Sequence, residues 1–192
     1  KLQLNEISSK VVSAKLGDEA VKTSLMAGAI GLAIVMLFMM VVYWIPGVAA
    51  ALALLLYVAA MLCFLNGLDV TLTLPGIAGI ILSVGMAVDA NVIIFTRIRE
   101  EIAAGKNVRE AIKIGFGKAL SAVIDGNITT LIAAAVLYLK GTGTIKGFAI
   151  TLALGIVLSM FTALVITRFV LMALYGIGFK DAKFYGKQKE AK

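Results

Sequence analysis

The chain has 192 residues, of which 61% are hydrophobic and only 15% are charged. A soluble domain carries roughly 45–50% apolar and about 25% charged residues, so lipid must cover part of this apolar surface. The net charge of +7 does not indicate a nucleic-acid partner, because the positive residues lie between and after the apolar runs, as membrane topology requires. With no histidine and a single cysteine, Cys63, we expect no metal site, no cofactor and no intrachain disulfide.

The chain does not open with methionine, and we interpret residues 1–23 as the end of a truncated extracytoplasmic domain followed by a lead-in helix. Leu2 and Leu4 alternate with polar residues, as at the end of a strand. Asp18 followed by Glu19 is typical of the start of a helix. The segment is therefore predicted to be a short extracytoplasmic N-terminal tail.

Five apolar segments are long enough to cross a bilayer, which needs about 20 mainly apolar residues. They cover approximately residues 24–45, 47–65, 72–95, 119–139 and 148–167. We therefore predict an all-α membrane protein with five transmembrane helices in one transmembrane domain over residues 24–175. A tight turn without charge at Trp44–Gly47 joins the first two spans.

The charged connections predict the topology. Six Lys/Arg residues lie in the 97–118 connection and five lysines in the 176–192 tail, and such an excess marks the cytoplasmic side. Five spans then place the N-terminus outside and the C-terminus inside. Gly105 interrupts the 97–118 run, and Asn107 stands three residues before Glu110, the spacing of an N-cap and its reciprocal partner. We predict a cytoplasmic helical hairpin lying at the inner membrane surface; a solvated linker is the alternative.

Two aspartates stand inside the spans, Asp89 in the third and Asp125 in the fourth. An ionised aspartate at mid-bilayer costs about 2.5–3.5 kcal/mol on insertion scales, and such residues mark proton or ion paths. At 1.5 Å per residue, Asp89 lies roughly 8 Å and Asp125 roughly 6 Å from the middle of its span, towards the same side. Asn91 and Asn127 follow two positions later, so the pattern Asp–small–Asn occurs twice. An interfacial carboxylate and a protonated one bonding two helices remain alternatives.

Polar residues extend the fourth-span site. Ser121, Asp125 and Thr129 are spaced four apart and share one helix face. Asn127 and Thr130 add polarity on an adjacent face. We therefore predict polar support for a hydrated or hydrogen-bonded path along this helix.

Small residues mark the third span as a close-packing helix. Gly85 precedes Asp89 by four residues and Gly79 precedes Ser83 by four, which allows a partner backbone to approach. Arg168 stands at the inner end of the last span, where it either supports the polar site or anchors the helix at the interface.

Six short runs stand in order along the chain: Leu74–Gly79, Gly85–Val92, Arg97–Glu101, Asp125–Thr130, Gly141–Gly143 and Ile145–Ala149. Their residues and order resemble those of the SecD/SecF family of protein-export membrane proteins, in particular its SecD members. The similarity covers roughly Leu16 to Tyr175. Thr96 stands where the family usually has an acidic residue, and Gly126 replaces the usual alanine.

The resemblance implies the resistance-nodulation-division type of fold, in which this chain is one half-transporter that pairs with a SecF-like half. It implies a non-enzymatic subunit of the Sec protein-export machinery in the cell membrane, coupling proton or cation movement to late preprotein translocation. A SecY-type translocation channel, the preprotein substrate and membrane lipid are the other implied partners. Asp89 matches the proton-relay aspartate of the family, with Asn91 beside it, and Asp125 matches a polar motif of less defined role.

The two alternative functions are a lipid or drug exporter and an intramembrane aspartyl protease. A lipid or drug exporter of the same fold would lack the charged run at Arg97–Glu101, which is present here. An intramembrane aspartyl protease would also use two aspartates on neighbouring helices. Its Gly-x-Gly-Asp motif is absent, because Met86, Ala87 and Val88 precede Asp89.

Overall fold

The computed structural model describes residues 14–68 and 72–185, and within these ranges the regular structure is entirely helical. Five helices are long and apolar enough to cross a membrane, which confirms the predicted all-α fold with five spans. The fifth is continuous from α5 through the π-helical turn η1 to α6. The elements are α1 (Ala14–Tyr43), α2 (Ile45–Gly67), α3 (Leu74–Ala103), α4 (Val108–Lys140), α5 (Thr144–Phe161), η1 (Thr162–Ile166), α6 (Thr167–Ile177) and the 3₁₀ turn η2 (Ala182–Tyr185).

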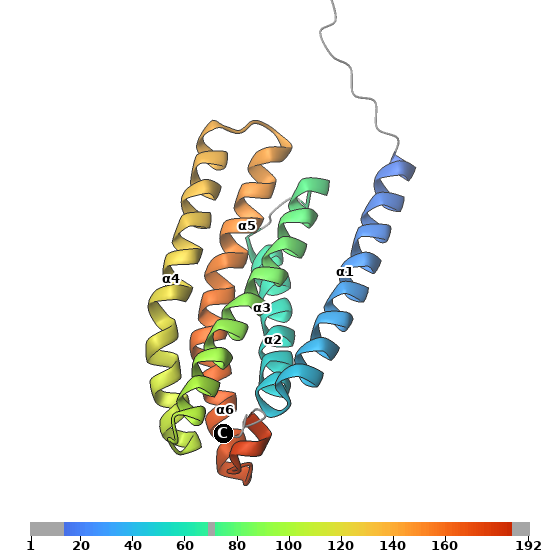
Figure 1. Ribbon diagram of the computed structural model, residues 1–192. Coiled ribbons are helices and arrows are strands. Elements are labelled where there is room, and N and C mark those ends of the chain that lie inside the picture. The colour runs from blue at the N-terminus through green and yellow to red at the C-terminus, as the bar shows by residue number, and fades with distance from the viewer. Residues whose placement is uncertain (1–13, 69–71, 186–192) are drawn as a thin grey trace, which may run out of the picture.

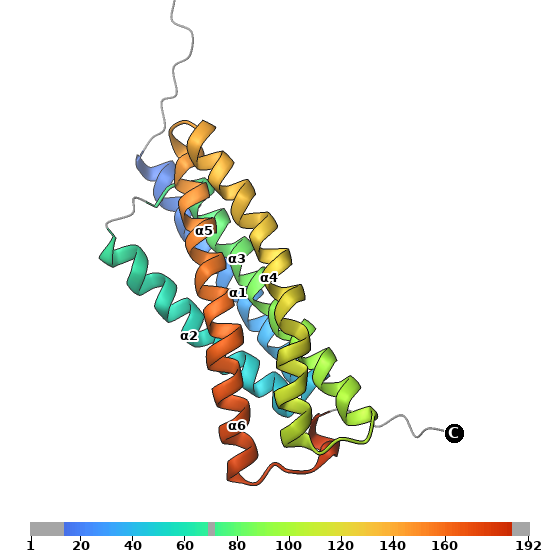
Figure 2. The ribbon, with the colours of Figure 1, turned by 90° about the vertical axis from the view of Figure 1, so that its left-hand side faces the viewer.

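The bundle is built around α3 and α5, which pack against each other and against α4 (Figures 1 and 2). α1 and α4 stand at opposite edges of the bundle (Figure 1). Large apolar side chains along both edge helices are exposed, among them Ile34 and Phe38 on α1 and Ile132 and Val136 on α4. These edges are therefore surfaces for lipid or for another membrane protein.

Several helices run beyond the apolar segments that predicted them. α1 begins at Ala14 rather than at Asp18, so the lead-in helix and the first span are one helix. α3 continues from residue 95 to Ala103, and α4 begins at Val108 rather than at residue 119. The predicted strand end at Leu2 and Leu4 lies outside the described residues.

Residues 97–118 consequently form the ends of two long helices and not a separate helical hairpin. The helices continue because Ile98 and Ile112 are buried between them, which gives the charged segment an apolar face. Gly105, with φ 86°, makes the turn. The predicted cap is present, because Asn107 Oδ1 accepts a hydrogen bond from Glu110 N–H at 2.9 Å. The Glu110 carboxylate accepts from the side-chain Nδ2 of Asn107, at 3.5 Å, and not from the Asn107 backbone N–H of a capping box.

Arg99, near the end of α3, holds the turn between α1 and α2. Its Nη2 donates to the carbonyl oxygen of Val42, an acceptor left free at the end of α1, and its guanidinium lies 4.4 Å from the centre of the Tyr43 ring. Its Nε donates to the carbonyl oxygen of Tyr185 at 3.2 Å, which also ties down η2. The first part of the predicted tail therefore packs back onto the bundle, and its residues 186–192 lie outside the described ranges.

Small residues let the backbones of α3 and α5 approach closely. A Cβ on Gly79 would lie 2.5 Å from Thr151 Oγ1 and 3.1 Å from the carbonyl oxygen of Phe148. The Thr151 hydroxyl is 3.0 Å from the carbonyl oxygen of Gly76 and can donate to it across the interface. Gly79 thus has the close packing predicted for it.

The same interface continues one turn further along both helices. A Cβ on Gly155 would overlap the side chain of Ser83, which is fully buried. The Ser83 hydroxyl is 2.6 Å from the phenolic oxygen of Tyr57 on α2. One small-residue contact therefore joins three helices.

We expect Gly155→Leu to destabilise the protein by about 1–3 kcal/mol or more, because the added side chain would force α3 away from α5. Gly31→Leu on α1 is the matched control, since its Cβ position has no heavy atom within 4 Å. Thermal unfolding of both variants in detergent measures the difference. Equal unfolding midpoints would contradict the importance of this contact.

Candidate functional site

Asp89 and Asp125 lie on the neighbouring helices α3 and α4, and both are exposed in this chain. Neither carboxylate has a hydrogen-bond or ion-pair partner among the described residues. Gly85, one turn before Asp89, is exposed as well, and a Cβ there would meet nothing within 4 Å. Gly85 is therefore not packed against another helix of the described chain, unlike Gly79.

The predicted polar face of α4 is present on the surface. Ser121, Asp125 and Thr129 are all exposed. The hydroxyl of Thr129 donates to the carbonyl oxygen of Asp125 at 3.1 Å, and that of Thr130 to the carbonyl oxygen of Gly126 at 3.3 Å. These two threonines thus bond to their own helix and leave the Asp125 carboxylate free.

The two Asp–small–Asn patterns have the same local structure. Asn91 and Asn127 are buried, and each Nδ2 donates to the carbonyl oxygen four residues earlier, on Ala87 at 3.2 Å and on Val123 at 2.7 Å. Two residues turn a helix through about 200°. In each helix the aspartate consequently faces outward and the asparagine inward, so Asn91 lies across α3 from Asp89 and not beside its carboxylate.

A buried contact links Asn91 to the last helix. Asn91 Oδ1 accepts from the hydroxyl of Thr167 at 2.9 Å, and the Thr167 side chain is fully buried. Thr167 directly follows the π-helical turn η1, and its N–H and hydroxyl both point to the carbonyl oxygen of Thr162. π-turns occur often at functional sites. Sequence reasoning missed Thr167, because one hydroxyl in an apolar run carries no signal of its partner.

Arg168 does not join the aspartates. It is exposed, its guanidinium lies 6.0 Å from the centre of the Phe116 ring, and it lines a pocket with Arg109 and Met172. The predicted polar group therefore divides into an outward aspartate face, a pair of inward asparagines and a separate arginine. No cluster of three or more metal-ligating acidic, His or Cys side chains occurs in the described ranges.

Glu101 is a second residue that sequence reasoning missed. It is 4% exposed, and its two carboxylate oxygens lie 2.6 Å from the ammonium groups of Lys106 and Lys118. These ion pairs close the turn between α3 and α4. Glu101 shares one side of α3 with Ile98 and Ile102, which are buried, and this spacing in the sequence could have indicated that Glu101 is buried too.

A family model described as protein export membrane protein SecD/SecF, C-terminal, matches residues 1–176. The chain belongs to the SecD/SecF family. The predicted resemblance is therefore confirmed.

Relatives and solved structures of the family agree. The chain is 52% identical over 186 residues to the protein translocase subunit SecD of Acidaminococcus fermentans, covering 96% of this chain and 45% of that protein. It is 48% identical over 168 residues to SecD of Synechocystis, covering 88% and 36%. The crystal structure of SecDF from Thermus thermophilus, a translocon-associated membrane protein, superposes with a TM-score of 0.83 at 44% identity, covering 85% and 23%. The chain thus spans less than half the length of these SecD/SecF proteins.

We expect Thr167→Val to destabilise the protein by about 1–3 kcal/mol, because it leaves the buried Asn91 oxygen without its donor. Thr96→Val is the matched control: the Thr96 side chain is exposed and its hydroxyl bonds only to Val92 of its own helix. Denaturation of the full-length protein in detergent compares the two. A loss no larger than that of the control would show that the Asn91–Thr167 bond contributes little.

Proposed function

We propose that this chain is the C-terminal membrane part of a SecD-type translocase subunit that couples proton, or other cation, movement to late preprotein translocation. The proposal is supported by family membership and by the names of the relatives, which are protein translocase subunits. The transport role is that of a motor component and not of an enzyme.

The observation that carries the coupling is a pair of carboxylates, Asp89 and Asp125, that have no partner among the described residues. They lie on adjacent helices that are apolar enough to span a membrane. An ionisable group in a span costs several kcal/mol unless it faces protein, water or a counter-charge. Asp89 can take up and release a proton as its surroundings change, and this is the step that couples cation movement to a change in shape. Asp125, Ser121 and Thr129 supply exposed polar groups on the neighbouring helix α4.

A SecF-like half is the partner that fits this face. Gly85 and Asp89 lie on one exposed stripe of α3, and Gly85 leaves room for another backbone. The second half would cover the aspartates and complete a site of which this chain supplies one side. A SecY-type channel and the preprotein act outside this bundle, in keeping with the translocon association of the solved SecDF relative.

The proposed orientation follows the positive charges. Lys and Arg concentrate at the end of the bundle formed by the α3–α4 turn and the end of α6, which we place on the cytoplasmic side of the cell membrane. The N-terminus is then extracytoplasmic and the C-terminus cytoplasmic. A lipid or drug exporter and an aspartyl protease are not favoured, because the family match is to protein-export proteins.

We expect Asp89→Asn in the full-length protein to reduce preprotein export to the level measured without an ion gradient, because the neutral amide cannot bind and release a proton. Export into sealed vesicles, with and without a proton or sodium gradient, measures the effect. Asp181→Asn, which removes an exposed carboxylate outside the spans, is the control and should export normally. Gradient-dependent export that survives in the Asp89 variant would refute the motor proposal.

We expect Gly85→Leu to weaken association with the SecF-like half while leaving this bundle folded, because the position is open within the chain. Gly79→Leu should instead disrupt the α3–α5 contact and lower thermal stability. Co-purification of the two halves, expressed as separate chains, and thermal unfolding distinguish these results. If Gly85→Leu leaves co-purification intact, the partner half does not pack on this stripe.

A further inference from the structure

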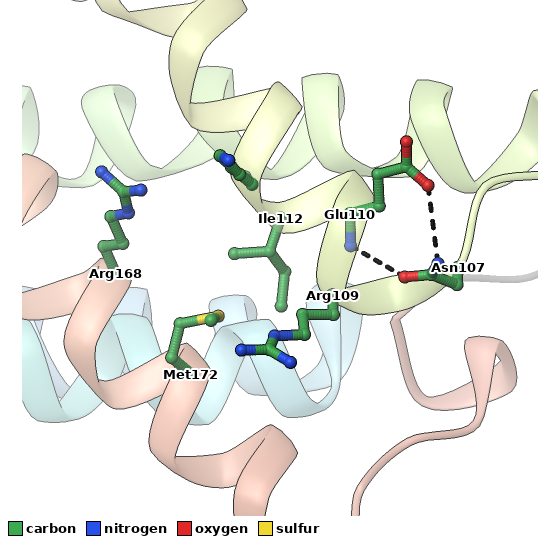
Figure 3. Close-up of a pocket in the computed structure, with 7 residues that line it drawn as sticks. Asn107, Arg109, Glu110, Ile112, Arg168 and Met172 are labelled. Carbon is green, nitrogen blue, oxygen red and sulfur yellow. Dashed lines mark hydrogen bonds between the residues drawn. The ribbon is translucent and has the colours of Figure 1, made fainter.

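A pocket of about 440 Å³ opens between the first turns of α4 and the helix α6 (Figure 3). Ile112 and Met172 form an apolar part of its wall, and the guanidinium groups of Arg109 and Arg168 lie to either side of them (Figure 3). Its lining residues belong to the start of α4 and to α6, so the pocket lies at the opposite end of α4 from the loop that leads to α5. Neither Asp89 nor Asp125 lines this pocket.

The ion pairs of the bundle leave an unbalanced positive charge at this pocket. Among the six Lys/Arg residues between 97 and 118, four have partners: Arg97 pairs with Glu100, Arg99 bonds to backbone oxygens, and Lys106 and Lys118 share Glu101. The remaining two line the pocket together with Arg168, and none of the three has a carboxylate within 4.0 Å among the described residues. These three cations are Arg109, Lys113 and Arg168.

The one acidic residue of the lining does not neutralise them. Glu110 directs its carboxylate to Asn107 Nδ2, at 3.5 Å, on the side of the pocket away from Arg168 (Figure 3). Three cations therefore surround the cavity against one carboxylate. Holding like charges together costs free energy unless an anion lies between them.

The depth of the cations matches the polar surface of a bilayer. Arg168 directly follows the apolar segment that ends at residue 167. Lys113 stands six residues before the apolar segment that begins at residue 119, which is roughly 9 Å along the helix. Leu120, two turns on from Lys113 on the same helix face, is 42% exposed. A cationic pocket thus lies directly beside an apolar helix surface that runs into the membrane.

We propose that this pocket binds the headgroup phosphate of an anionic phospholipid, with an acyl chain lying along α4 past Leu120. A guanidinium binds phosphate with two parallel hydrogen bonds, and basic pockets between spanning helices are suited to anionic headgroups. An acidic protein segment would neutralise the positive charges but would not cover the adjoining apolar surface. The lipid would also hold α6 against α4.

The test measures lipid retention by the full-length protein. R109Q/K113Q/R168Q is compared with wild type and with K22Q/K140Q/K146Q, which removes three cations from the opposite end of the bundle. Native mass spectrometry counts the phosphatidylglycerol that stays bound through detergent washing, and titration with phosphatidylglycerol gives the affinity. We expect the pocket variant to bind about fivefold more weakly for each charge removed, and the control to bind as wild type does.

Two further measurements separate the lipid from other anions. R109K/R168K keeps the positive charges but removes the planar guanidinium groups that make two parallel hydrogen bonds. It should bind phosphatidylglycerol more weakly than wild type while unfolding at the same temperature. Inorganic phosphate alone should bind weakly to wild type. Equal lipid retention in the pocket variant and wild type, or phosphate binding that depends on the three cations while lipid retention does not, would overturn the proposal. So would a protein carboxylate between Arg109 and Arg168 in a structure determined in phosphatidylglycerol nanodiscs.

Discussion

The close approach of α3 and α5 is the contact on which the rest of this bundle depends. Lipid tails are as apolar as leucine, so helices in a membrane associate through tight packing and hydrogen bonds and not through hydrophobic burial. Gly79 and Gly155 permit that approach, and the Thr151 hydroxyl bonds across it. Once α3 is fixed against α5, its rotation is set, and with it the outward direction of Asp89 and the inward direction of Asn91.

That rotation separates two kinds of polar residue that lie two positions apart in the chain. Asn91 bonds to Ala87 of its own helix and to Thr167 of the last helix, and Asn127 bonds to Val123 of its own helix. The two aspartate carboxylates have no hydrogen-bond or ion-pair partner among the described residues. A charged group facing lipid costs free energy that no other interaction offsets. An outward carboxylate on a spanning helix is stabilised by polar protein or water around it, and the partner half proposed above would provide those surroundings.

The sequence was sufficient for the number of spans, the cap at Asn107 and the close packing at Gly79, because each depends on local composition or spacing. The turn between the first two spans was predicted over Trp44–Gly47, whereas the helix breaks at Trp44 and α2 already begins at Ile45. It placed the helix ends less well: apolar windows stop where charge begins, whereas α3 and α4 continue because Ile98 and Ile112 keep an inward face. The Thr167–Asn91 bond was out of reach, since it joins residues 76 positions apart and depends on how the π-turn rotates the last helix.

The two ion pairs of Glu101 have a mechanical consequence. They fasten the short link between α3 and α4 from both sides, with one lysine in the link and the other on α4. The two aspartate-bearing helices are therefore held together at one end, and the ion pairs restrain the sliding of one helix past the other there. A movement of either helix at that end would therefore carry the other helix with it. The opposite end of α3 is held by a different contact, that of Gly76 and Gly79 with Thr151 of α5.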